Sequence, residues 1–210
     1  MIEDHTNIAQ LMEQVTTKNP DLLEVRLDKL QNNKIVDELA TGKSFPIIAT
    51  DMSDRGTASR LEKLAYAAST GFEFVDLDYA TSNAATVNQM KSRGAQVILS
   101  FHDYSRTPPE QELTKILEAE KRLGGDICKI VTTARVPRDS LAVLGFVQHE
   151  AKNARLVSFA MGVHGVPSRI LSPWLGAEFT FASLSSPSRT AEGQPTIDEL
   201  RSAWAILGLQ

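Results

Sequence analysis

Apolar and β-branched runs recur along the chain at nearly even intervals, with longer amphipathic segments between them. Runs of strand length lie at residues 22–28, 45–50, 72–78, 96–102, 127–133, 156–161 and 178–183. Helical spacing of apolar residues marks residues 7–20, 59–70, 83–94, 108–125 and 139–153. Short apolar runs are typical of buried strands, and apolar residues three and four apart are typical of helices. The alternation of strand and helix predicts a parallel α/β fold.

The predicted boundaries carry residues that begin and end helices. Gly71, Gly94 and Gly124 follow helical segments, where a residue in the left-handed conformation is favoured. Thr107 and Pro108 supply an N-cap and a proline for the first turn of the next helix.

Such an alternation fits either a closed (βα)8 TIM barrel or an open doubly wound sheet. The length of 210 residues gives about 26 residues for each of eight units, near the lower end for barrels. Titratable residues also gather at the C-terminal ends of several predicted strands instead of at one switch point. We therefore expect residues 1–210 to form one (βα)8-barrel catalytic domain, whose first strand, at "MIE", is very short or truncated.

Composition and charge narrow the classes of partner. Hydrophobic residues make up 42% of the chain, charged residues 23%, and the formal net charge is -4. A negative net charge disfavours nucleic-acid binding, which rests on clustered Lys and Arg. A single cysteine leaves no internal disulfide, and neither a signal peptide nor an apolar window of ~18 residues is present. We expect a cytoplasmic protein whose partner is a small molecule or another protein, and no membrane partner.

Lys129 lies within "ICKIVTT", a predicted strand that is otherwise largely apolar. Ile127 and Val131 share its face of the strand, and Cys128 and Ile130 share the other. One interpretation is a lysine that snorkels or forms a buried ion pair. The other is an amine kept partly neutral by desolvation, which can attack a carbonyl and form a Schiff base. We expect Cys128 to pack under helices, facing away from Lys129.

His102 ends the predicted strand before the one that carries Lys129, at the edge where barrel active sites lie. A histidine at this position is either a hydrogen-bonded structural residue or a general acid and base. Schiff-base chemistry needs a neighbouring group that moves protons, and imidazole suits that task. Adjacent strands are expected to bring His102 and Lys129 close together.

Three charged residues, Glu24, Arg26 and Asp28, alternate along "LLEVRLD" and are expected on one strand face. They either pair with one another or form a polar floor that binds substrate hydroxyls. The two interpretations are compatible, because a ligand site needs supporting contacts.

Two segments that follow later predicted strands, "GVPSRI" (165–170) and "TAEGQP" (190–195), are expected to be loops. Arg169 can bind a carboxylate with its guanidinium fork, and Thr190 and Gln194 can hydrogen-bond hydroxyls. No pair of histidines has the spacing of metal ligands, so no metal site is expected.

The ordered set "EVRLD", "SFHDY", "ICKI", "SRI" and "TAEGQP" resembles the type I 3-dehydroquinate dehydratase family of the shikimate pathway, over nearly the whole chain. The resemblance implies a (βα)8 barrel, usually a homodimer, that acts as a hydro-lyase without metal or cofactor. It also implies conversion of 3-dehydroquinate to 3-dehydroshikimate, in which Lys129 forms the imine and His102 is the general acid and base. The implied substrate-binding residues are Glu24 and Arg26 at ring hydroxyls, Arg169 at the carboxylate, and Thr190 and Gln194 closing over the ligand.

The chain departs from the family pattern in two loops. Where the family has an Arg followed four residues later by an acidic residue, this chain has Asp51 followed by Arg55, so the order of the two charges is reversed. We expect either a swapped ion pair beside His102 or a shifted register in which Arg55 or Arg60 supplies the cation, so Arg55 is a further substrate-binding candidate. In the last loop Glu192 replaces the usual Pro, which removes a fixed φ and predicts a more mobile closing segment.

Two alternatives remain open from the residues alone. Another Schiff-base barrel lyase, of the class I aldolase or transaldolase kind, also places a lysine on a barrel strand. The segments after the last two predicted strands lack a Gly-rich phosphate loop, which disfavours it. A non-catalytic binding barrel is disfavoured by the presence of both Lys129 and His102.

Overall fold

The computed structural model describes residues 8–30, 32–53 and 56–209. The expected first strand at "MIE" and the candidate Arg55 lie outside these residues. The chain divides into two compact units, of which the first comprises Met1–Ile98 with Leu123–Gly125 and the second Leu99–Arg122 with Asp126–Gln210. That residues 1–210 act as one catalytic domain stays a prediction.

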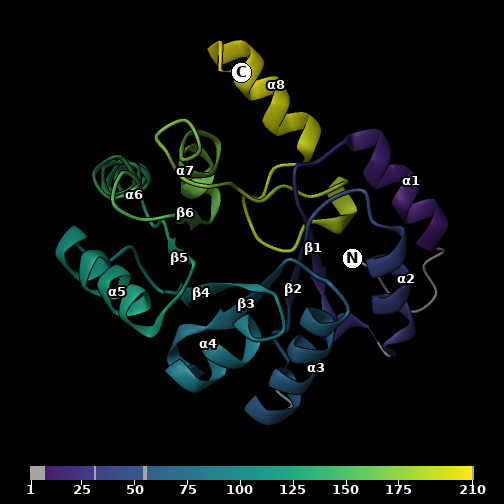
Figure 1. Cartoon of the computed structure of the whole chain (residues 1–210). Helices are drawn as coiled ribbons and strands as arrows, with labels where there is room; N and C mark the ends of the chain where they lie inside the picture. The colour runs from purple at the N-terminus through teal and green to yellow at the C-terminus, as the bar shows by residue number, and fades with distance from the viewer. Residues whose placement is uncertain (1–7, 31, 54–55, 210) are drawn as a thin grey trace. The chain divides into compact units, whose positions relative to one another are not determined.

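The first unit alternates helix and strand from the start of its described part (Figure 1). Its elements are α1 (Ile8–Lys18), β1 (Leu23–Arg26), the 3-10 turn η1 (Leu27–Lys29), α2 (Lys34–Gly42), β2 (Ile47–Thr50), α3 (Thr57–Ser69), β3 (Phe74–Asp78), η2 (Tyr79–Thr81), α4 (Ala84–Lys91) and the beginning of β4 (Gln96–His102). Strands β1, β2 and β3 are parallel neighbours, with Glu24 beside Ile48 and Ile48 beside Phe74. Strand interiors such as Val25, Ile48 and Val75 are buried, as expected for parallel strands covered on both faces.

Local capping sets the helix starts that the sequence predicted. The Asn83 side chain accepts hydrogen bonds from the backbone of Ala85 and Thr86, and the Thr86 hydroxyl accepts one from Asn83 in return, which begins α4. Gly71, just past α3, has φ +103, the conformation that favours glycine at a helix end.

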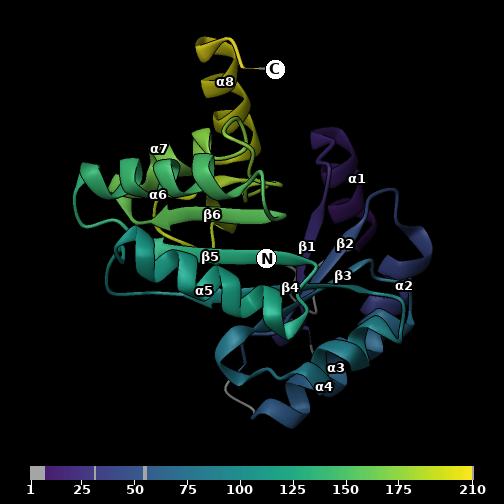
Figure 2. The same cartoon turned by 60° about the vertical axis from the view of Figure 1, so that its left-hand side comes forward.

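The second unit continues the alternation. Its elements are the end of β4, α5 (Glu110–Leu123), β5 (Ile127–Thr133), α6 (Pro137–Glu150), β6 (Leu156–Met161), the 3-10 turn η3 (Val163–Gly165), α7 (Val166–Leu171), η4 (Ser186–Ser188) and α8 (Ile197–Leu207). Figure 2 shows β5 and β6 side by side and pointing the same way, in a register that sets Lys129 beside Val157.

The two faces of β5 have different surroundings. Cys128 and Ile130 pack in an apolar cluster with Leu117 of α5 and Phe146 of α6. This confirms that Cys128 packs under helices. Because strand side chains alternate, Lys129 points to the opposite face of the sheet.

The strand order decides between the two predicted windings. Among the described residues, the strands of the sheet lie in the order β1-β2-β3-β4-β5-β6. A doubly wound sheet reverses its strand order at a switch point, whereas barrel winding keeps chain order throughout. The winding is therefore of the barrel type.

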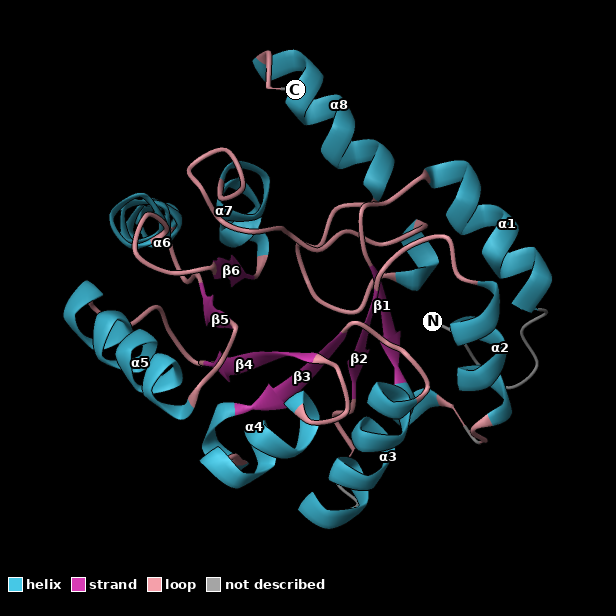
Figure 3. Ribbon diagram, viewed as in Figure 1, coloured by secondary structure: helices cyan, strands magenta, loops and turns pink. Residues whose placement is uncertain are grey.

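Two sequence predictions in the second unit are wrong. Residues 178–183 do not form a strand: Figure 3 draws the segment as loop, and its pairing is an isolated bridge of Ser183 with Thr196. Residues 165–170 are not a loop, because α7 begins at Val166 with a proline in its first turn, a position where proline's missing N–H needs no partner. No described helix has both the length and the hydropathy that a membrane span requires.

Candidate active site

Lys129 is a buried lysine on β5, with 6% of its surface exposed. Its Nζ lies 4.5 Å from the centroid of the Phe181 ring, within the range of a cation–π contact. Phe181 comes from the irregular segment that the sequence assigned to a seventh strand. The Lys129 amine is therefore held against an aromatic face inside the second unit.

Aromatic rings connect Lys129 to a second buried cation, Arg169. The Phe181 and Phe159 rings meet edge to face with centroids 6.0 Å apart, and Phe179 meets Phe181 in the same way at 5.5 Å. The Arg169 Cζ lies 4.2 Å from the centroid of Phe159. Rings with fixed edge-to-face geometry restrict how the two cations move.

Arg169 is 2% exposed, and its Nε has no hydrogen-bond partner among the described residues. Burial lowers the pKa of Arg169 to about 10, since desolvation disfavours the charged form. A buried guanidinium with an unused donor is suited to receive an anionic ligand group.

The start of α7 is fixed to β6, which sets the place of Arg169. The Ser168 hydroxyl accepts a hydrogen bond from the Ala160 backbone N–H at 2.8 Å and donates one to the Gly165 carbonyl at 2.6 Å. A side chain at position 165 would overlap the Ala160 carbonyl. Only glycine permits this close approach of helix and strand.

The segment with Thr190 and Gln194 closes on itself. The backbone N–H and the hydroxyl of Thr190 donate to the Gln194 Oε1 at 2.8 and 3.1 Å. The backbone N–H fixes which amide atom is the oxygen, so Nε2 is the end of Gln194 that these bonds leave unused. Gln194 is buried, and the segment is tied to the end of β6 by a bond from the Gly162 N–H to the Glu192 carbonyl.

His102 is the last residue of β4, the strand next to β5 in the sheet order. The Asp103 N–H after it donates to the Val131 carbonyl of β5 at 2.9 Å. The His102 ring stacks on Tyr104, with centroids 5.7 Å apart and planes 11° from parallel. His102 and Lys129 thus belong to neighbouring strands of the same unit, as predicted.

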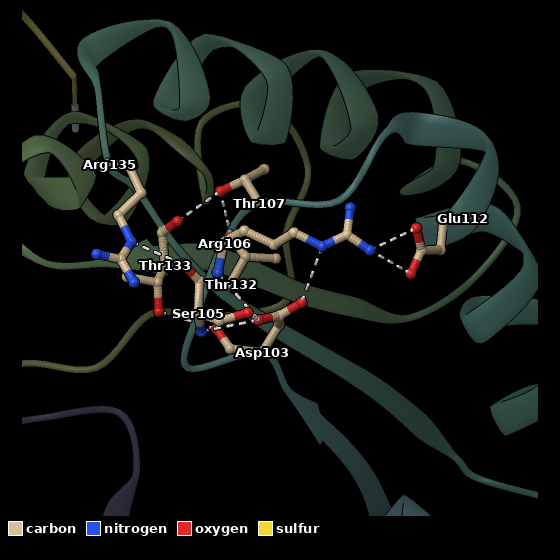
Figure 4. Close-up of polar contacts among 8 residues, drawn as sticks. All are labelled: Asp103, Ser105, Arg106, Thr107, Glu112, Thr132, Thr133 and Arg135. Atoms are coloured by element: carbon tan, nitrogen blue, oxygen red, sulfur yellow. Dashed lines mark hydrogen bonds and ion pairs between the residues drawn. The ribbon is translucent and has the colours of Figure 1, made fainter.

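The turn after His102 is dense in polar contacts (Figure 4). The Asp103 carboxylate accepts from the Ser105 hydroxyl at 2.6 Å and from the backbone N–H groups of Ser105 and Arg106. Burial raises the pKa of Asp103, but these hydrogen bonds and the Arg106 charge outweigh it, so the pKa lies below its usual range. A carboxylate that stays ionised keeps the turn closed.

Glu24 and Arg26 belong to the first unit. Arg26 donates through Nε and Nη2 to both oxygens of Asp28, each at 2.8 Å, and Glu24 accepts from the Thr50 hydroxyl at 2.9 Å. Burial raises the pKa of Asp28, but the bonds from Arg26 and the Met52 backbone hold it below its usual range. Asp28 lies in η1 and not on the strand, so the predicted row of three charges on one strand face is wrong. The structural ion pair is present.

Asp51 is buried, its Oδ1 accepting from the Ser53 N–H at 2.9 Å, while its Oδ2 has no partner among the described residues. The swapped ion pair expected between Asp51 and Arg55 stays a prediction. Within the part of the chain that the structure describes, no group of three or more acidic, histidine or cysteine side chains is arranged to hold a metal ion.

Sequence reasoning missed the two rings that contact the cations. The sequence predicts strands at "LVSFAM" and "EFTFAS" but gives Phe159 and Phe181 no role. The sequence offers no signal that pairs these rings with Lys129 and Arg169, because the contacts join residues that are far apart along the chain.

The family model for type I 3-dehydroquinase matches residues 1–210. The chain belongs to this family. Two curated members, both named 3-dehydroquinate dehydratase, are similar to it: one from Thermococcus gammatolerans is 35% identical over 211 residues, covering 96% of this chain and 94% of the relative. The other, from Dehalococcoides mccartyi, is 32% identical over 201 residues, covering 92% and 90%.

A solved structure of the 3-dehydroquinate dehydratase from Geobacillus kaustophilus resembles the chain with a TM-score of 0.86, at 24% identity and covering 96% of this chain and 86% of the other. At that identity the likeness establishes the fold. The resemblance predicted from the motifs, the TIM-barrel type of α/β fold and the hydro-lyase class of the type I 3-dehydroquinase family are confirmed.

Proposed function

We propose that the chain dehydrates 3-dehydroquinate to 3-dehydroshikimate through a Schiff base on Lys129, with His102 as general acid and base. The observation that carries the proposal is the pair of buried cations, Lys129 and Arg169, held by contacting rings in one unit. The substrate has a ketone for an amine to attack and a carboxylate for a guanidinium to bind. Membership of the type I 3-dehydroquinase family supports the same reaction.

The imine explains how an unactivated proton is removed. The neutral Lys129 amine adds to the ketone, His102 as general acid donates a proton to the carbinolamine hydroxyl, and loss of water leaves a protonated imine and a neutral His102. His102 then takes a proton from the adjacent carbon, and the electron pair moves into the iminium to form an enamine. The enamine expels the β-hydroxyl, which leaves as water with a proton from His102. Hydrolysis of the imine releases the conjugated product and restores Lys129.

The remaining residues hold the substrate. Arg169 binds the carboxylate, the Gln194 Nε2 donates to a ring hydroxyl, and Thr190, whose own proton goes to Gln194, accepts from one. Glu24 and Arg26 bind further hydroxyls, Arg26 through the Nη1 that its pair with Asp28 leaves unused. Arg55 is an additional candidate for this set.

A direct assay tests the function. The purified chain is incubated with 3-dehydroquinate, and the ultraviolet absorbance and mass of the product are followed. We expect a conjugated acid lighter than the substrate by one water. Lys129→Ala abolishes the conversion, and Lys152→Ala, which changes an exposed lysine of the same unit, leaves it unchanged. No conversion by the unaltered chain would overturn the proposal, and cleavage of a carbon–carbon bond would favour the aldolase alternative.

Two further expectations belong to the proposal. The active form is a homodimer, as is usual in the family that the motifs resemble, and the enzyme acts in the cytoplasm with no metal or cofactor. Sedimentation analysis of the purified chain tests the dimer, and a monomer with full activity would contradict it.

A further inference from the structure

Tyr104 is an aromatic residue in the turn after β4 that is 64% exposed. Its ring lies nearly parallel to the His102 imidazole, with centroids 5.7 Å apart and an interplanar angle of 11°. An exposed ring gains little from burial in a core. Packing in a core therefore does not explain the position of the ring, whose aromatic contact is with His102.

The Asp103 side chain closes the turn that contains Tyr104. The Asp103 Oδ1 accepts from the Ser105 N–H at 2.8 Å, the Ser105 hydroxyl at 2.6 Å and the Arg106 N–H at 3.0 Å. Three bonds to one oxygen fix the backbone on the C-terminal side of Tyr104, as in an Asx turn.

The same turn is tied to the end of β5, the strand that carries Lys129 (Figure 4). The Thr133 hydroxyl donates to the Asp103 carbonyl at 2.8 Å, and the Thr133 N–H donates to the Arg106 carbonyl at 3.1 Å. Arg135 adds a bond from Nε to the Ser105 carbonyl at 2.7 Å. The backbone on both sides of Tyr104 is thus held relative to β5.

We propose that Tyr104 is a positioning residue, whose ring holds the plane of the His102 imidazole in the orientation needed for proton transfer. The inference rests on the proposed role of His102 as general acid and base. The torsion that rotates an imidazole about its Cβ–Cγ bond is broad and nearly two-fold, so the backbone alone does not fix where the ring nitrogens point. A flat neighbour on a backbone that is held on both sides restricts that rotation, and proton transfer depends steeply on such geometry.

The test compares Tyr104→Phe, which keeps a flat ring, with Tyr104→Ala, which removes it. We expect kcat of Tyr104→Ala to fall by about tenfold to a hundredfold, while KM changes little because the ring is not assigned a substrate contact. Tyr104→Phe restores kcat to within about threefold of the unaltered chain, since the stacking face is kept. Trp174→Ala, which removes another exposed aromatic side chain, 67% exposed, is the matched control and leaves kcat and KM unchanged.

A second comparison separates positioning from general stability. In a His102→Ala background, Tyr104→Ala produces no further loss of kcat, because there is no imidazole left to orient. A further loss of the same size in that background, or equal kcat for Tyr104→Ala and the unaltered chain, would overturn the inference. Thr133→Val, which removes the hydroxyl that ties the turn to β5, lowers kcat and Thr133→Ser restores it. Absence of dehydration by the unaltered chain would instead count against the proposed function.

Discussion

The Nζ of Lys129 lies 4.5 Å from the centroid of the Phe181 ring. A ring in this position attracts positive charge at Nζ. In the proposed mechanism the neutral amine becomes a protonated imine at this nitrogen, so the ring would stabilise the charge that develops there during the reaction.

The first prediction concerns that ring. Phe181→Leu keeps an apolar side chain but removes the π face, and we expect turnover to fall by about threefold to thirtyfold. Single-turnover kinetics measure the change in rate. Borohydride trapping is expected to show that the imine still forms at Lys129 in this variant. Unchanged turnover in this variant would remove Phe181 from the site.

Arg169 is predicted to bind the substrate and to lower the free energy of unfolding. Burial lowers its pKa to about 10, so the folded state disfavours the charged guanidinium; this penalty is fully present below that pH and is relieved as the pH rises above it. Arg169→Met is expected to raise the free energy of unfolding by about 1 to 2 kcal/mol and to abolish substrate binding. Urea unfolding at neutral pH and a binding titration measure the two effects.

The control for Arg169 is an arginine on the surface of the same unit. Arg155 pairs with Glu178 at 2.6 Å and its side chain is 44% exposed, so Arg155→Met should change stability by less than about 1 kcal/mol and leave binding intact. If Arg169→Met proved much less stable than the unaltered chain, the buried guanidinium would have a structural partner and not a ligand as its main role.

Cys128 is predicted to be unreactive in the folded protein. Burial and, to a smaller degree, the charge and hydrogen bond of Glu120 raise the pKa of Cys128 to about 12, so the thiol stays protonated at ordinary pH. A thiol-specific reagent at pH 8 should modify it only after addition of denaturant. Rapid modification of the native chain would show that β5 opens readily.

The Thr190 to Gln194 segment is predicted to act as a small closing element. Gln194→Ala removes the acceptor of two Thr190 bonds, and we expect weaker substrate binding and faster proteolysis within residues 185–195. Glu192→Pro is expected to do the opposite by fixing φ, and bound ligand should slow cleavage in each variant. Identical cleavage with and without ligand would show that the segment does not close over the substrate.

Part of this arrangement could be predicted from the sequence, because some signals are local. Continuous apolar runs located the strands from β1 to β6. The position of Lys129 inside one of these runs made it a candidate site residue before its surroundings were known. The strand predicted at residues 178–183 is wrong because apolar residues at alternate positions are also the pattern of a half-buried strand. In the structure Phe179 and Phe181 pack on each other without the hydrogen bonds of a strand. The sequence pattern also placed a loop at residues 165–170, where α7 begins at Val166 with Pro167 in its first turn. The contacts among Lys129, Phe181, Phe159 and Arg169 join distant segments, which no local pattern displays.

Chemical trapping tests directly whether Lys129 forms the proposed Schiff base. The purified chain is mixed with 3-dehydroquinate and sodium borohydride, which reduces an imine to a stable secondary amine, and the peptides are mapped by mass spectrometry. We expect a substrate adduct on Lys129, a loss of activity in proportion to the adduct formed, and no adduct in Lys129→Ala. Turnover without any adduct, or an adduct on another lysine such as Lys121, would contradict it.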